Sequence, residues 1–185
     1  LAVSGQTRED HNKNDPLNTI LRHQFDQLEN DRINLLNRLA EYSEDILNQK
    51  PGLEKWSVNQ ILIHLLTSEK LTLNYLKKKS LGINTLKDSG LLAEAKLSLL
   101  KISQRLPLRF KAPKFLKQNT PDPLSLPELT NQWNNSRNEL LNFLESIGEE
   151  NLRKLIYKHP VAGRFNVSQC LVFLHEHFHH HQPQV

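Results

Sequence analysis

Apolar residues recur at steps of three and four in four stretches of this 185-residue chain, and this spacing is the strongest constraint on its fold. The first stretch runs from about Leu17 to Gln49 and stops at Lys50-Pro51-Gly52, and the others cover about 56–79, 127–146 and 167–182. Leucine is abundant while glycine, valine and aromatic residues are sparse, which favours helix over sheet. We therefore expect an all-α fold, a four-helix bundle with no convincing strand.

Each stretch has one face that we expect to pack against the core. In the second stretch, Ser57 precedes the apolar run and Gln60 follows three positions later, which predicts a capping box at the start of that helix. The residues expected to face the core are Ile20, Leu21, Phe25, Leu28, Leu35, Leu36, Leu39, Tyr42 and Ile46 in the first stretch, Ile61, His64, Leu65, Ser68, Leu71 and Tyr75 in the second, and Leu129, Trp133, Arg137, Leu140 and Leu144 in the third.

The connection between the second and third long helices is long and irregular, which permits a crossover topology. Within it we expect one short extra helix at about 91–104, facing inward through Leu92, Ala95, Leu99 and Ile102. Five prolines then mark a loop that a compact domain uses either to cover something or to move. Residues 1–16 are polar and are expected to be a flexible lead-in to one domain over 17–185.

Composition excludes several classes of protein. No apolar run approaches the roughly 18 to 20 residues that span a bilayer, and the N-terminus lacks the basic and apolar regions of a signal peptide. The single cysteine, Cys170, cannot form an internal disulfide. We therefore expect no membrane partner and a cytoplasmic location.

Much of the net charge of +4 comes from residues 101–117, which hold six basic residues and no acidic ones. This segment is either a solvated basic loop or a site for an anionic substrate or polyanion, with Arg105, Arg109, Lys111 and Lys114 as candidate anion-binding residues. Nucleic acid is not favoured as the partner, because the chain has no zinc-finger cysteine pattern and no aromatic RNA-binding motif.

Five of the nine histidines lie in the last eleven residues. His177 and His181 continue the apolar stripe of Cys170, Phe173 and Leu174, so we expect both imidazoles to point inward. Four residues apart on a helix, their Cβ atoms lie about 5 to 6 Å from each other, and both rings can reach one ion. His175 and His179 form a competing pair at the same spacing on a neighbouring face, which we rank well below His177 and His181.

His64 interrupts the apolar stripe of the second helix and is the third candidate ligand. Three imidazoles around one ion with an open position make a catalytic metal site. The alternative for His64 is an ordinary hydrogen-bonded core histidine. For the terminal cluster the alternatives are surface histidines or an affinity tag, although Glu176 and Phe178 interrupt the run.

Four motifs in order make the chain resemble the DinB-like (DinB/YfiT) superfamily, over about residues 17–185. They are Trp56-Ser57 followed by His64, Trp133 followed by Arg137, the turn His159-Pro160-x2-Gly163, and the closing series Phe173, His177, His181, Gln184 and Val185. One departure is Pro183, which removes a helical hydrogen bond just after His181.

The resemblance implies a four-helix bundle that holds a divalent transition metal (zinc, nickel or an iron-group ion) through His64, His177 and His181. It also implies a small-molecule substrate, with a low-molecular-weight thiol as the candidate. Bundles of this kind often dimerise, so a homodimer is the candidate assembly. A metal-dependent thiol S-transferase or hydrolase is thus our leading hypothesis. The alternative is a non-catalytic helical module whose histidines are structural or bind metal adventitiously.

Overall fold

The computed structural model describes residues 17–53, 55–105, 123–159 and 162–185, and the side chains of residues 92 and 103–105 are not among those described. Its long helices are α1 (Thr19–Leu39), α3 (Val58–Ser80), α6 (Leu126–Ser146) and α7 (Val167–His181). The expected lead-in, residues 1–16, lies outside the described part of the chain. None of the described helices is long and apolar enough to cross a membrane.

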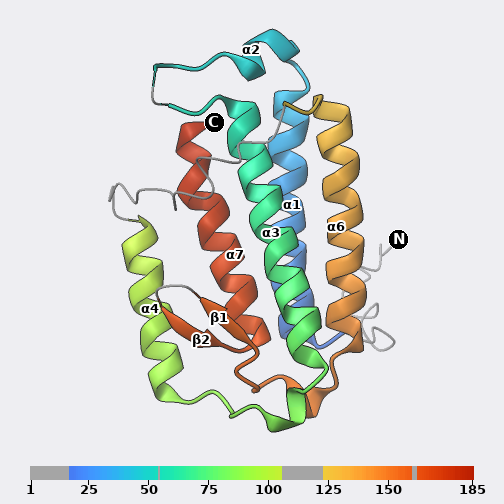
Figure 1. The fold of residues 1–185 in the computed structure, drawn as a ribbon, viewed down its shortest axis with the longest axis vertical. Helices are drawn as coiled ribbons and strands as arrows, with labels where there is room; N and C mark the ends of the chain where they lie inside the picture. Colours follow the sequence, from blue (N-terminus) through green and yellow to red (C-terminus); the bar gives the residue numbers. More distant parts are fainter. Residues whose placement is uncertain (1–16, 54, 106–122, 160–161) are drawn as a thin grey trace, which may run out of the picture.

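The four long helices run side by side, α1 and α7 in one direction and α3 and α6 in the other (Figure 1). Helix α7 packs against α1 and α3, and α6 also packs against α1 and α3. The predicted mostly helical fold is therefore confirmed. The expected extra helix is present as α4 (Leu91–Arg105), in the long connection that leads from α3 to α6, and it packs on α7.

The first predicted helix is in fact two helices. Helix α1 ends at Leu39, and the short α2 (Glu44–Asn48) begins after Ser43, whose side chain accepts a hydrogen bond from the Ile46 amide. After the turn at residues 40–42, this N-cap starts a new helix within a continuous apolar pattern. As a result Tyr42 and Ile46, both expected in the core, are about half exposed.

Helix α2 also holds the start of α6. The Leu126 amide donates to Glu44 Oε1 at 2.7 Å, so that a carboxylate of α2 caps the positive N-terminus of α6. At this end of the molecule, α2 lies beyond the ends of α1, α3 and α6 (Figure 1).

Three other predictions about buried faces were wrong. Ile20 on α1 is 63% exposed and Leu71 on α3 is 52% exposed. Helix α4 turns a different face inward, burying Ala93, Leu97 and Leu100. The expected residues Ala95, Leu99 and Ile102 point to solvent instead, because apolar residues on both sides of α4 left its inward face ambiguous.

Two short antiparallel strands, which the sequence pattern did not predict, precede α7. Strand β1 (Tyr157–His159) pairs with β2 (Gly163–Phe165), with Tyr157 opposite Phe165 and His159 opposite Gly163. Three residues are too few for a period of two to be visible in a sequence. Gly163 has φ of +95°, a conformation that residues with a Cβ rarely adopt, and this accounts for the glycine of the His-Pro-x2-Gly turn.

A buried polar network ties α3 to α6 and α1. Glu69 on α3 accepts hydrogen bonds from Trp133 Nε1 and Arg137 NH2 on α6, both at 2.8 Å. Arg137 Nε also lies 3.7 Å from Glu29 Oε2 on α1. Burial raises the pKa of Glu69 and the Arg137 charge opposes that shift, so the carboxylate depends on its partner to stay ionised.

Replacing either partner alone, Glu69→Leu or Arg137→Leu, should reduce the free energy of unfolding by about 3 to 5 kcal/mol, because it leaves a buried charge uncompensated. The Glu69→Leu/Arg137→Leu double variant should lose less than the sum of the single losses. Urea denaturation of metal-free protein measures all three.

The matched control is the exposed pair Lys77–Glu139, which joins the same two helices. Removing it should change stability little. Additive single losses at Glu69 and Arg137 would contradict the proposed dependence of one charge on the other.

Candidate metal centre

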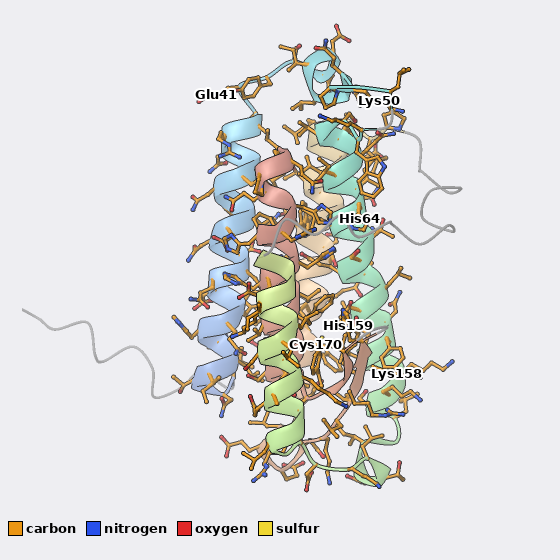
Figure 2. The ribbon with its side chains drawn as sticks, turned by 90° about the vertical axis from the view of Figure 1, so that its left-hand side faces the viewer. Glu41, Lys50, His64, Lys158, His159 and Cys170 are labelled. Atoms are coloured by element: carbon orange, nitrogen blue, oxygen red, sulfur yellow. The ribbon has the colours of Figure 1, made fainter. Side chains whose placement is uncertain are left out.

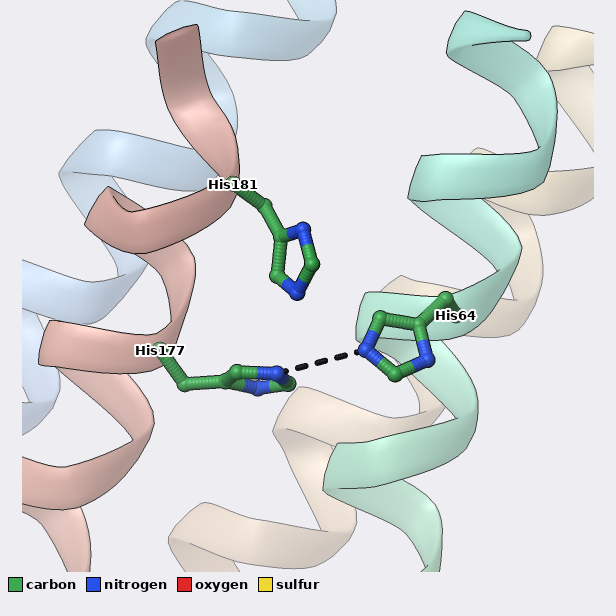
Figure 3. Close-up of side chains that lie close together, drawn as sticks. All are labelled: His64, His177 and His181. Atoms are coloured by element: carbon green, nitrogen blue, oxygen red, sulfur yellow. Dashed lines mark hydrogen bonds between the residues drawn. The ribbon is translucent and has the colours of Figure 1, made fainter. Parts of the chain in front are cut away.

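The three predicted ligands come together between α3 and α7. His64 lies on the first half of α3, whereas His177 and His181 lie one turn apart near the end of α7. Figure 3 shows the three imidazoles pointing toward one another from the two helices, with a dashed line between His64 and His177. One nitrogen from each ring lies within 4.8 Å of the others, so this group could hold a metal ion.

Local sequence explains how each helix presents its histidines. Ser57 and Gln60 form the predicted capping box at the start of α3. Helix α7 begins with a second capping box, between Asn166 and Gln169, which the sequence reading missed. Helix α7 then ends at His181 as Pro183 predicts, and the chain continues as the 3-10 turn η3 (Gln182–Gln184).

The closest pair fits the geometry of a shared ion. His64 Nε2 lies 3.2 Å from His177 Nε2. Two nitrogens that each bind one ion at 2.0 to 2.2 Å, at angles between 90° and 109°, are separated by about 2.8 to 3.6 Å. The ring of His181 lies beside both, with its centroid 4.8 Å from that of His64 and 4.9 Å from that of His177.

Gln184 orients one of the three rings. Its Oε1 lies 3.3 Å from His181 Nδ1 and can accept the proton of that nitrogen. The neutral ring then has a free lone pair on Nε2, the nitrogen left for a metal. The sequence reading identified no such supporting partner for the ligands, although Gln184 belongs to the closing motif that it quoted.

Aromatic rings surround the triad. Trp56 lies 5.1 Å from His64 and 6.4 Å from His181, between ring centroids. Phe173 stacks on His177 at 5.7 Å and contacts His159 of β1 at 4.7 Å. The tryptophan and phenylalanine of the family motifs therefore form walls of the site.

Burial keeps the three imidazoles neutral. It is the main cause that lowers the pKa of His181 to about 4, and it lowers the pKa values of His64 and His177 as well. Neighbouring histidines add to each shift by repulsion between like charges. Neutral imidazole is the form that binds metals, so the folded chain presents ligands that need not lose a proton first.

The remaining residues that the sequence singled out, Cys170 and the basic residues, are not part of the triad. Cys170 is fully buried and burial raises the pKa of its thiol, as befits a core residue. Of the anion-binding candidates, Arg105 ends α4 and its side chain is not described, while Arg109, Lys111 and Lys114 lie outside the described residues.

Comparison with known proteins agrees with the motif reading. The family model described as DinB superfamily matches residues 27–185. A relative, the uncharacterized protein YuaE of Bacillus subtilis (strain 168), is 27% identical over 154 residues, which is 83% of this chain and 90% of the relative. No solved structure shows a significant match.

In metal-free protein, NMR titration should place the His181 midpoint near pH 4 and those of His64 and His177 below the ordinary value of 6.5. Because the unfolded chain takes up these protons at a higher pH than the folded chain, their contribution to stability is complete above about pH 6.5 and is lost as the pH falls toward 4. Midpoints near 6.5 for all three would show that the rings are solvated rather than buried.

Proposed function

The chain belongs to the DinB superfamily, and we propose that it is a metalloenzyme in which His64, His177 and His181 hold one divalent transition metal ion. The four long helices would then form the four-helix bundle expected for the family, with the ion bound between α3 and α7. The observation that carries this proposal is the meeting of three neutral, partly buried imidazoles from two helices, with the nitrogens of one pair 3.2 Å apart.

Three protein ligands leave open positions on the ion. Because all three are neutral, none of them compensates its charge. Such an ion supplies Lewis acidity, which stabilises an anion such as a thiolate or a hydroxide beside it. We favour a low-molecular-weight thiol as the anion. In the reaction, its thiolate sulfur would form a bond to an electrophilic carbon of a small molecule, and the group displaced from that carbon would leave. Hydrolysis by bound hydroxide is the runner-up.

The residues around the triad have separate tasks in this proposal. Gln184 holds the His181 tautomer that leaves Nε2 free. Trp56 and Phe173 exclude water from two sides of the triad and offer apolar surface to the carbon part of a small substrate. Exclusion of water strengthens the attraction between ion and anion.

Metal content tests the first step. The His64→Ala/His177→Ala variant should bind one equivalent of divalent metal less than wild type, in protein purified without a metal-affinity column. The control is His23→Ala, which removes an exposed histidine of α1. Equal metal content in all three proteins would contradict the proposed site.

Cobalt(II) substitution tests the chemistry. Adding 2-mercaptoethanol to the cobalt(II) form should produce a sulfur-to-cobalt charge-transfer absorption that the His64→Ala/His177→Ala variant lacks. Cys170→Ala should leave this absorption in place, because the buried Cys170 thiol is not the ligand.

The same titration separates the two classes of function. A cobalt(II) site that binds no added thiol and no other exogenous ligand, such as azide, is closed by protein groups. That result would favour the alternative, a non-catalytic module with structural histidines.

A further inference from the structure

A second cluster of metal-binding side chains lies between α1 and α7, and it shares no residue with the triad. Its members are Asp31 on α1 and the pair His175 and His179 on α7. The side chains of all three are partly exposed, at 29%, 29% and 39% respectively. The cluster thus lies at the surface, in contrast to the more enclosed first site.

Its three donor atoms form a nearly equilateral triangle. Asp31 Oδ2 lies 3.2 Å from His175 Nε2 and 3.0 Å from His179 Nε2, and the two nitrogens are 3.2 Å apart. All three edges fall within the about 2.8 to 3.6 Å expected for atoms bound to one ion.

Hydrogen bonds alone satisfy at most two edges of this triangle. Each ring nitrogen either carries one proton or accepts one, and an ionised carboxylate only accepts. If both nitrogens donate to Asp31, the edge between the two histidines holds no hydrogen bond. If one nitrogen lacks its proton, two lone pairs meet across its edge with Asp31. A cation satisfies all three edges, because each atom then directs a lone pair at it.

Gln182 favours the His179 tautomer that has no proton on Nε2. Its Oε1 lies 2.9 Å from His179 Nδ1, where it accepts the proton of that nitrogen. The neutral His179 ring then carries no proton on Nε2, the atom that lies 3.0 Å from the carboxylate. A carbonyl that accepts from the far side of an imidazole is the usual supporting partner of a histidine ligand.

We propose that Asp31, His175 and His179 form a second divalent metal site, which joins α1 to α7. Two imidazoles and one carboxylate on one face of an ion suit zinc and the iron-group ions, and leave positions open. His175 also lines a cavity of about 510 Å³, together with residues such as His23 and Gln27 of α1 and Lys101 of α4. The ion therefore borders a hollow that is accessible to small molecules.

The zinc stoichiometry of the full chain tests this proposal independently of the first site. In the His64→Ala/His177→Ala background, which lacks two ligands of the first triad, calorimetric titration with zinc chloride should still find one ion per chain. Adding Asp31→Asn should weaken that binding by more than about 100-fold, since even a lost supporting partner costs 10- to 100-fold. Adding Asp26→Asn, the same change at an exposed carboxylate of α1 outside the cluster, should leave it unchanged.

A second measurement covers variants that fold poorly. Zinc should raise the midpoint of thermal unfolding in the His64→Ala/His177→Ala protein, because the ion binds only the folded state, and Asp31→Asn should abolish this shift. Circular dichroism confirms that each variant is folded.

Two outcomes would overturn the proposal. One is the absence of zinc binding in the His64→Ala/His177→Ala background. The other is binding in that background that Asp31→Asn leaves unchanged, since the ion would then be held by other histidines. Failure of the first site has a different signature, namely unaltered zinc stoichiometry when His64 and His177 are replaced in an otherwise wild-type chain.

Discussion

The buried carboxylate of Glu69 needs the charge of Arg137 and the indole N–H of Trp133, and this need fixes how α3 lies against α6. The hydrophobic effect has no direction, whereas a buried ion pair loses several kcal/mol when its geometry is broken. His64 precedes Glu69 by five residues on the same rigid helix. The network therefore also fixes the height at which α3 presents its imidazole to α7.

Helix α7 contributes histidines to both clusters because the helical repeat turns alternate histidines to opposite sides of the helix. Residues two apart on an α-helix are separated by about 200° around the axis, so they point to nearly opposite sides. His177 and His181 face α3, while His175 and His179 face Asp31 on α1. The turn that follows supports both, through Gln184 at His181 and Gln182 at His179.

Much of the first site was predictable from the sequence, because each ligand is marked by the pattern of residues around it within its own helix. Helical spacing placed His177 and His181 on one stripe, and the break in an apolar pattern marked His64. The fold was predictable to the level of its long helices, but not at Ser43, where a local cap overrides the apolar period. The contact of Asp31 with His175 and His179 was missed, because the residue spacing within one helix does not indicate which residue of another helix it contacts. For the same reason the pattern placed Arg137 on the inner face of α6 without indicating its partner, Glu69.

Helix α7 packs against α1 and α3 and lies between them in Figure 2, and this position has a mechanical consequence. A shift of α7 toward α3 would bring His177 and His181 closer to His64 and carry His175 and His179 away from Asp31, since both pairs lie on the same helix. Ions bound at both proposed sites would therefore act on a single displacement in opposite senses. Occupancy of one site would then be coupled to affinity at the other, and by thermodynamic reciprocity the coupling would be equal in both directions.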